Sequence, residues 1–448
     1  MRRLVAAGSL VLALASEPSA WPLVFGTSSG NRVAAGSGTF PRWQALALQT
    51  DAPVRWLVAF APGRLAGLDK EGTFSIFQVS RGGVSVAGRY GEVASPDAPP
   101  VTVRLEREQT GVVLVATDGR LLLWSEDALR GYDVGAPLSR LTFPVPVKWS
   151  GRDSDDLLAV AQDGGVVLIG GLNTGGPRII ARTDARALPD ARITIADLDG
   201  DGVPEALVLA DPTDRYPHGI LGDRIEAGSL VAIGLSPNGL DLRARYTMPA
   251  PAVFEDLVPL VASVGGTNSP VVLLARSAPR HGAALVALGW REGGLALVAE
   301  GVGYGQSHRW THLIGAADLT GDGKSEVVAV ATPHLVGVLS AYRLTGGYLA
   351  RIARAPGYSS HAAGSRNLEQ ALIADLDGNG FPEVVVPRQS RDALAGLELQ
   401  GDRWAERWSL DLKATVRSNL LAADLDGDGL LDLAVADRRA LNVFLSVR

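Results

Sequence analysis

Hydrophobic residues in this chain occur mostly in short runs, which are separated by clusters of Gly, Pro, Asp and Asn. Examples are the apolar segments at residues 112–116, 157–161, 271–275 and 433–436, which are rich in Val, Leu and Ala. Short apolar runs bounded by turn residues are typical of buried β-strands. No segment combines a sustained helical periodicity with helix caps, so we expect no long helix. The pattern therefore predicts an all-β fold.

The strand clusters recur at intervals of about 45 to 65 residues, which is the length of a four-stranded propeller blade with its loops. We count eight such units and favour a single β-propeller of eight blades. Seven blades is the alternative if residues 42–89 do not form a separate blade. The last unit, 420–448, supplies only three strands. Because an unpaired edge strand is a liability, we expect the N-terminal strand around Trp43–Gln49 to complete the last blade.

Four of the predicted turns carry the same acidic pattern between two apolar runs. Side chains with oxygen atoms stand at positions 1, 3 and 5, Gly stands at position 6 and an acid stands at position 9. The four sets are Asp197, Asp199, Asp201, Gly202 and Glu205; Asp318, Thr320, Asp322, Gly323 and Glu326; Asp375, Asp377, Asn379, Gly380 and Glu383; and Asp424, Asp426, Asp428, Gly429 and Asp432. Calcium takes six to eight oxygen ligands, and alternate residues of a tight loop can direct that many oxygens at one centre. The Gly permits the backbone reversal, so the pattern predicts four calcium sites.

Two other motifs resemble these loops and are excluded by spacing. An EF-hand needs a bidentate Glu at position 12 and a helix on each side. Here the flanks are strand-like and position 12 is apolar, being Val208, Ala329, Val386 and Val435. The stretch GDGKS at 321–325 resembles the end of a phosphate-binding P-loop, but Asp318 stands where the leading Gly of that motif belongs.

The segment "ADLDGDGLLDLAVAD" (423–437) and its three counterparts resemble the FG-GAP/VCBS repeats of integrin-like β-propellers, in the form common in bacterial secreted proteins. The resemblance implies blades that are stabilised by bound calcium, with the acidic loop joining the first two strands of a blade. It does not imply a single activity, because the family includes adhesion modules, lectin-like proteins and accessory domains of enzymes.

Composition narrows the class of protein. The chain has 448 residues, of which 46% are apolar, and its 53 Gly and 26 Pro suit many short strands joined by turns. It has no Cys, which excludes disulfides, thiolate metal sites, a cysteine nucleophile and a lipoprotein anchor. The formal charge of −6 is small for this length, and bound calcium would offset it, so we expect no nucleic-acid partner.

The N-terminus resembles an export signal. Arg2 and Arg3 precede an apolar run at 4–15, which is too short to span a membrane comfortably. We therefore predict a signal peptide at 1–20, cleaved after Ala15 or Ala20, a linker at 21–41 and the propeller at 42–448. The mature protein is expected to be periplasmic, extracellular or on the cell surface, without a transmembrane segment and as a monomer.

A second group of candidate residues lies in the loops that precede the innermost strands. These are His308, Arg309, His361, Arg366 and Arg417. If the blades are equivalent, these side chains converge at one mouth of the central channel and could bind a carboxylate, a sulfate or an acidic sugar; otherwise each is an ordinary loop residue. The six His residues show no HExxH or similar spacing, so we expect no transition-metal site. An unusually long stretch at 211–229 is either a functional loop or a plain surface excursion.

These features favour a non-catalytic, calcium-stabilised platform outside the cytoplasm that binds a protein or a carbohydrate. Each acid of the loops has a structural role, so we assign no catalytic residue. The alternative is a polysaccharide lyase or another sugar-directed enzyme whose site lies at the channel mouth, built on the same His and Arg residues. An enzymatic activity therefore stays open, with the binding platform preferred.

Overall fold

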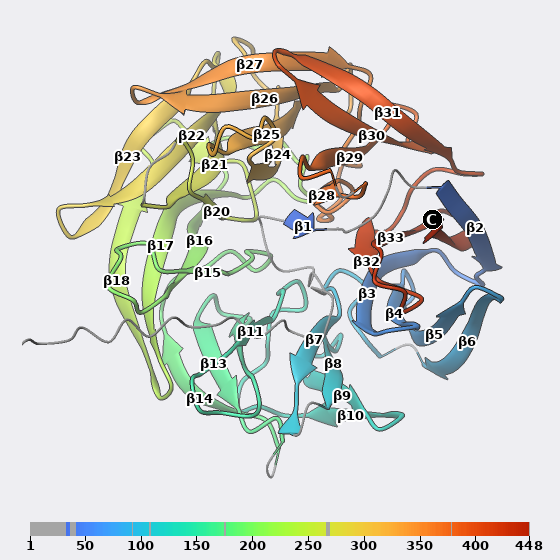
Figure 1. Ribbon diagram of the computed structural model, residues 1–448. Helices are drawn as coiled ribbons and strands as arrows, with labels where there is room; N and C mark the ends of the chain where they lie inside the picture. Colours follow the sequence, from blue (N-terminus) through green and yellow to red (C-terminus); the bar gives the residue numbers. More distant parts are fainter. Residues whose placement is uncertain are drawn as a thin grey trace, which may run out of the picture.

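The computed structural model describes residues 33–35, 42–91, 93–106, 109–173, 176–265, 269–377 and 379–447. Within these ranges the regular structure consists of strands alone. The strands form antiparallel sheets that stand around a common centre, one after another in chain order (Figure 1). This arrangement is a β-propeller, so the predicted all-β propeller fold is confirmed. No helix long and apolar enough to cross a membrane occurs in these ranges.

Three sheets in the first half of the propeller each consist of four consecutive strands. The first contains β3 (Val54–Ala61), β4 (Arg64–Asp69), β5 (Phe74–Ser80) and β6 (Gly83–Tyr90). The second contains β7 (Val101–Arg104), β8 (Thr110–Val115), β9 (Leu121–Ser125) and β10 (Ala128–Tyr132). The third contains β11 (Val145–Val147), β12 (Asp156–Val160), β13 (Val166–Gly170) and β14 (Arg178–Thr183).

The middle of the chain forms one continuous sheet of 13 strands. Its first group is β15 (Thr194–Ala196), β16 (Glu205–Thr213), β17 (Glu226–Ser236) and β18 (Gly239–Thr247). The connecting strand β19 (Val253–Phe254) leads to β20 (Leu260–Ala262), β21 (Val271–Ala278), β22 (Gly282–Arg291) and β23 (Gly294–Gly301). The last group is β24 (Thr311–Ala317), β25 (Glu326–Ala331), β26 (Val338–Thr345) and β27 (Tyr348–Pro356). Since β19 and a short β23–β27 pairing join these groups, the number of blades stays a prediction.

A five-stranded sheet follows, made of β28 (Leu372–Asp375), β29 (Glu383–Pro387), β30 (Ala393–Gln400), β31 (Arg403–Asp411) and β1 (Val33–Ala35). Strand β1 pairs in parallel with the innermost strand β28 and lies near the centre of the ring (Figure 1). The predicted linker at 21–41 otherwise lies outside the described residues, as does the predicted signal peptide at 1–20.

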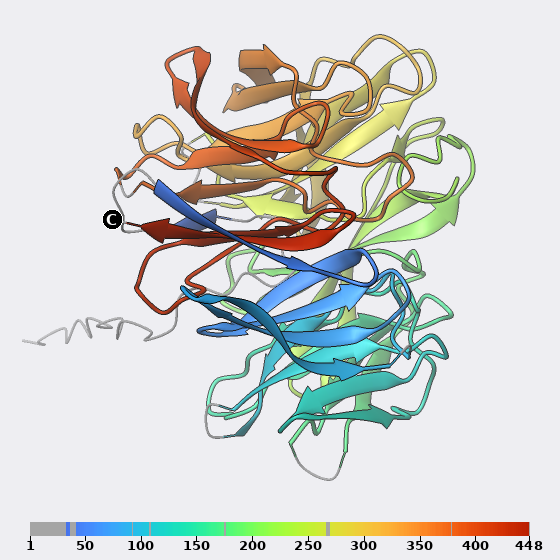
Figure 2. The ribbon, with the colours of Figure 1, turned by 90° about the vertical axis from the view of Figure 1, so that its right-hand side faces the viewer.

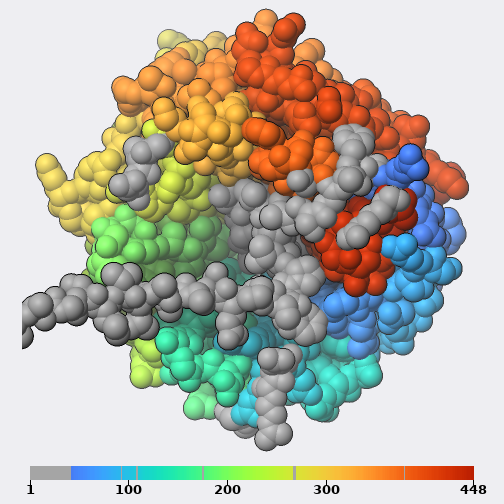
Figure 3. Space-filling model, in the orientation of Figure 1, coloured from blue at the N-terminus to red at the C-terminus, as the bar shows by residue number. Residues whose placement is uncertain are grey.

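The ring is closed by strands from the two ends of the chain. The last sheet contains β32 (Leu421–Ala423), β33 (Asp432–Ala436), β34 (Ala440–Val447) and β2 (Arg42–Gln49). All eight residues of β2 pair antiparallel with β34, and the blue strand lies along the red ones in the side view (Figure 2). In the space-filling view the two ends of the colour scale likewise meet in the ring (Figure 3). The prediction that the strand at Trp43–Gln49 completes the last sheet is confirmed.

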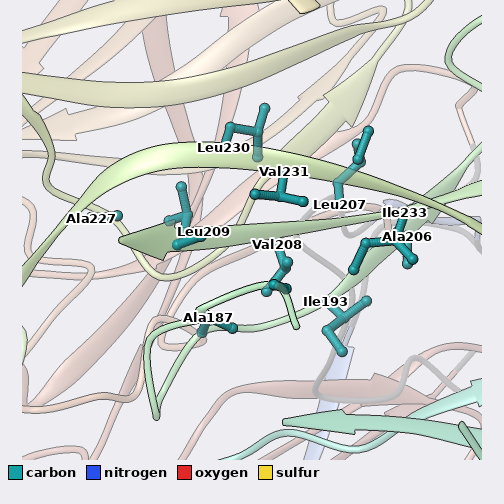
Figure 4. Close-up of a cluster of buried hydrophobic side chains, with 14 of the residues drawn as sticks. Ala187, Ile193, Ala206, Leu207, Val208, Leu209, Ala227, Leu230, Val231 and Ile233 are labelled. Carbon is teal, nitrogen blue, oxygen red and sulfur yellow. The ribbon is translucent and has the colours of Figure 1, made fainter. Parts of the chain in front are cut away.

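The core lies between successive sheets. The second strands of the sheets are buried on both faces, as Leu207 and Val208 on β16 show, because each sheet packs between two neighbours. Buried side chains of β16 and of the adjacent β17 belong to the same hydrophobic cluster (Figure 4). This stacking explains why the sequence shows continuous apolar runs rather than strict alternation.

Candidate functional site

Each acidic loop joins the first two strands of its group and folds around its first carboxylate. In the first loop, the carboxylate of Asp197 accepts hydrogen bonds from the backbone N–H groups of Gly200 and Gly202, at 2.8 and 3.0 Å. Asp318 and Asp424 accept equivalent pairs of bonds in their loops, and Asp375 accepts bonds from the backbone N–H groups of Asn379 and Gly380. The position-6 glycines have positive φ angles, which are 86° at Gly202 and 84° at Gly429. The spacing read from the sequence therefore corresponds to one repeated loop geometry.

The acid at position 9 begins the second strand and is buried beneath its loop. Glu205 accepts a hydrogen bond of 3.0 Å from the backbone N–H of Leu198, at position 2. Glu326, Glu383 and Asp432 accept the same bond in their loops. Burial raises the pKa of Glu383 to about 8 and that of Asp432 to about 7. A buried carboxylate next to other acids is unfavourable unless a positive charge compensates it.

Three loops gather their acids closely enough to hold one cation. Ligand atoms lie within 4.8 Å of one another in each of the sets Asp197, Asp199 and Glu205; Asp375, Asp377 and Glu383; and Asp424, Asp426 and Asp432. In the third loop, Oε1 of Glu383 is buried and has no hydrogen-bond partner. An all-oxygen donor set with an unsatisfied buried carboxylate oxygen fits a hard cation such as calcium.

The second loop differs because an arginine reaches into it. The guanidinium of Arg343, on β26, makes an ion pair with Glu326 and lies 3.3 Å from both Oδ2 of Asp322 and Oγ1 of Thr320. Arg343 therefore supplies positive charge to residues of the calcium site that was predicted from the sequence. In the fourth loop, Arg81 bonds Asp426 and Asp428 at 2.9 and 2.7 Å, from a position on the loop edge where half of its side chain is exposed.

The five residues proposed for the channel mouth lie at the opposite ends of the innermost strands from the acidic loops, but only some of them meet. Arg366 and Arg417 line one small cleft, whose volume is about 40 Å³. His308 stacks on Tyr216 with ring centroids 5.2 Å apart, and Arg309 contributes only a bond of 3.1 Å to the carbonyl of His308. The structure therefore brings Arg366 and Arg417 together at one cleft, and Arg309 is not among the residues that line it.

His361 belongs to a buried histidine cluster that the sequence did not predict. Its Nδ1 lies 2.8 Å from Nε2 of His334, and its Nε2 lies 2.8 Å from the carbonyl oxygen of Ser365. Trp310 stacks on His312 and His334, with centroid distances of 5.2 and 6.0 Å. Burial lowers the pKa of His334 to about 4 and holds that of His361 well below its usual value. His334 and His361 are therefore neutral at neutral pH.

The long stretch at 211–229 lies across the channel mouth. Leu221 packs with Leu257, Val258 and Trp310, and the backbone carbonyl of Ile220 accepts a bond of 2.9 Å from the N–H of Gly364. Gly222 has a φ of 112°, and a Cβ there would lie 2.5 Å from the guanidinium of Arg366. The stretch is thus a packed structural loop that fixes Arg366, rather than a plain surface excursion.

Beneath this loop lies a group of buried charges that sequence reasoning also missed. Arg192 is 1% exposed and makes an ion pair of 2.9 Å with Glu369, which lies in the loop before β28. Glu226 is 2% exposed, and its burial next to Glu255 raises its pKa to about 10. No local sequence pattern marks these residues, because each contact joins loops that are far apart along the chain.

The comparisons agree with this architecture. Residues 375–435, which contain the third and fourth acidic loops, match the FG-GAP-like repeat family. No curated protein matches the chain. The crystal structure of Saccharomyces cerevisiae Sqt1 is similar over 92% of this chain and 100% of that chain, at a TM-score of 0.56 and 10% identity.

Two further solved structures are similar in the same way. The Dos1 propeller corresponds to 90% of this chain and 94% of that chain, at a TM-score of 0.52 and 10% identity. The WD40 domain of SCAP from fission yeast covers 90% of this chain and 98% of that chain, at a TM-score of 0.50 and 7% identity. Such low identities establish the fold alone. The protein is a β-propeller that carries an FG-GAP-like repeat at 375–435.

Proposed function

We propose that this protein is a calcium-stabilised β-propeller that acts as a binding platform for a protein or carbohydrate ligand, without catalytic activity. The observation that carries the proposal is the gathering of three carboxylates within 4.8 Å in each of three loops of identical construction. Each of these loops lies between two strands and far from the opposite mouth. A cation there fixes turns and is not positioned to contact a ligand at the cleft.

The first, third and fourth loops would hold calcium through their acids, with Asp201, Asn379 and Asp428 at position 5 contributing further oxygens. Bound calcium supplies the positive charge that the buried position-9 acid lacks. At a free calcium concentration about 100 times the dissociation constant, a site that exists only in the folded state stabilises that state by about 2.7 kcal/mol. We propose the second loop as a weaker calcium site, because Arg343 already pairs with its acids.

The enzyme alternative finds little support among the residues named for it. His361, a natural candidate for a general base, is fully buried and both of its ring nitrogens have partners. Arg366 pairs with Asp190 and Asp223 at 2.8 and 2.6 Å. A base must reach the proton that it removes, and a ring closed off in this way does not.

The proposal includes export of the protein from the cytoplasm. The basic residues and the apolar run at the N-terminus support a protein that works outside the cytoplasm. Calcium sites of moderate affinity suit extracellular calcium concentrations, which are in the range where weak modular sites fill.

The test is a thermal melt of the chelated protein, titrated separately with calcium and magnesium. We expect a calcium-selective rise in Tm, reduced stepwise by Asp197→Ala, Asp375→Ala and Asp424→Ala. The matched control is Asp402→Ala, which removes an acid from an exposed turn that has no such cluster. Equal responses to the two ions, or a calcium response that survives the three substitutions together, would refute the assignment.

A further inference from the structure

The cleft at the channel mouth is built by four separate segments of the chain. It is lined by Arg55, Trp56, Pro96, Asp97, Gly364, Ser365, Arg366, Asn367 and Arg417. Arg55 and Trp56 begin β3, whereas the other segments precede the innermost strands β7, β28 and β32. Its cavity volume is only about 40 Å³. The cleft can therefore enclose a single small polar group, such as a carboxylate, while the rest of a ligand stays outside it.

The cleft is lined by more positively charged side chains than negatively charged ones. Arg55 pairs with Asp97 at 2.5 Å, and Arg366 pairs with Asp190 and Asp223. The exposed guanidinium of Arg417 makes no ion pair with any carboxylate in the described part of the chain. Three arginines therefore face a lining that contains one acid, and one of the three is uncompensated.

Arg391, which does not itself line the cleft, adds further positive charge next to Arg417. Arg391 is partly buried and donates a bond of 2.7 Å to the carbonyl of Val416, next to Arg417. Its burial and the charge of Arg417 lower the pKa of Arg391 to about 10. Among the residues that the structure describes, no carboxylate pairs with Arg391. Two neighbouring cations without a counter-charge are unfavourable, and an anion in the cleft would relieve the repulsion.

The cleft also contains an amide donor without a partner. Asn367 is 5% exposed, its Oδ1 accepts a bond of 2.8 Å from the backbone N–H of Glu369, and its Nδ2 has no partner. A buried N–H group left unsatisfied costs about 1–3 kcal/mol, so such a group marks a position that a ligand oxygen can complete. The unsatisfied amide and the uncompensated Arg417 line the same small cleft.

We propose that this cleft binds the carboxylate group of an organic acid, with the carboxylate held between the guanidinium of Arg417 and the amide of Asn367. Resting on the proposed function, the inference assigns a ligand class to the platform. The planar fork of arginine matches a carboxylate with two parallel hydrogen bonds, and the amide donates a further bond. Arg55 and Arg366 contribute positive potential while they hold the walls through their own ion pairs.

The experiment is isothermal titration calorimetry of the calcium-saturated full chain with D-glucuronate, D-glucose, acetate and sulfate. We expect saturable binding of glucuronate, no binding of glucose, and at least a tenfold loss of glucuronate affinity in Arg417→Gln and in Asn367→Asp. Tighter binding of glucuronate than of acetate supports the proposal and assigns further contacts to the sugar ring at the rim of the cleft. Equal binding supports it and assigns the carboxylate alone. Arg309→Gln is the control, because Arg309 lies on the same face outside the cleft.

Absence of glucuronate binding, binding of sulfate in its place, or unchanged affinity in both cleft variants overturns the proposal. The calcium-dependent Tm of each variant is measured in parallel. A normal calcium response without carboxylate binding rejects the cleft alone, whereas loss of the calcium response in the unaltered protein rejects the proposed function. Arg417→Lys gives an independent check, since it keeps the charge and removes the fork, and it should retain only part of the affinity.

Discussion

The guanidinium of Arg343 makes an ion pair with the buried carboxylate of Glu326, within the second acidic loop. Burial leaves Glu326 fully enclosed, and Arg343 also lies 3.3 Å from Oδ2 of Asp322. The arginine therefore supplies to the buried position-9 acid the positive charge that the corresponding acids of the other loops would take from a metal. The acids raise the pKa of Arg343 above its usual value, so it keeps this charge at every physiological pH.

Replacing Arg343 with Met should convert the second loop into a stronger calcium site. The variant loses the ion pair but keeps most of the apolar stem, so the chelated protein should melt at a lower temperature. Added calcium should restore the Tm, and calorimetry should find one more calcium ion per chain, or a clearly tighter weak site, than in the unaltered protein. Arg354→Met is the control on β27, where the side chain is exposed and lies outside the loop. An unchanged calcium stoichiometry and affinity would show that Arg343 does not compete with the metal.

Replacing Gly429 with Ala should weaken the fourth loop through the backbone alone. Gly429 has a φ of 84°, and a Cβ there would have open space around it. The left-handed conformation costs an L-residue about 1–2 kcal/mol, whereas Asn tolerates it better. We expect Gly429→Ala to lower stability by about that amount in urea unfolding, and Gly429→Asn to lower it less. Equal effects of the two substitutions would indicate that side-chain contacts, rather than the φ angle, decide the outcome.

The features that could be predicted from the sequence are those set by local spacing. Oxygen-bearing residues at fixed intervals around a Gly define the acidic loops, and a final sheet with three strands requires a fourth from elsewhere, which β2 supplies. Arg343 could not be assigned, because it comes from β26, 17 residues beyond the acid that it contacts. The pair Arg192 and Glu369 is separated by 177 residues and joins the loops before β15 and β28, so only the folding of the ring brings it together. Contacts across the mouth depend on the geometry of the ring and leave no local pattern.

Because His334 is partly buried in the histidine cluster, we expect the folded protein to lose stability on acidification. The pKa of His334 is lowered from 6.5 to about 4, mainly by burial and further by the charge of Arg391. Since the unfolded chain takes up the proton at higher pH than the folded chain, stability falls as pH decreases from about 6.5 to about 4 and then levels off. Because His334 is partly exposed, we expect a contribution of about 1–2 kcal/mol rather than the full value of the shift.

The measurement is urea unfolding between pH 7.5 and 4.5 of the unaltered protein and of His334→Gln. Many carboxylates titrate in this window, so the informative quantity is the difference between the two free energies of unfolding. As pH falls, the free energy of unfolding of the unaltered protein should decrease more than that of His334→Gln. His281→Gln is the control, since His281 is exposed and its Nδ1 bonds only the carbonyl of Pro279. A pH-independent difference for His334→Gln would mean that His334 does not remain neutral in the folded protein.

Replacing Arg192 alone, so that Glu369 loses its ion-pair partner, should strongly reduce the stability of the protein. Both side chains are 2% exposed, and the guanidinium of Arg192 also lies 3.8 Å above the ring of Phe143 and donates a bond of 2.7 Å to the carbonyl of Arg366. Arg192→Met leaves the carboxylate of Glu369 buried without this cation, so we expect a loss of about 3–5 kcal/mol in urea unfolding. Glu369→Gln added to Arg192→Met removes the buried charge and should recover part of that loss. If the double variant is as unstable as Arg192→Met, the loss arises from the contacts of Arg192 with Phe143 and the 366 carbonyl rather than from the stranded charge.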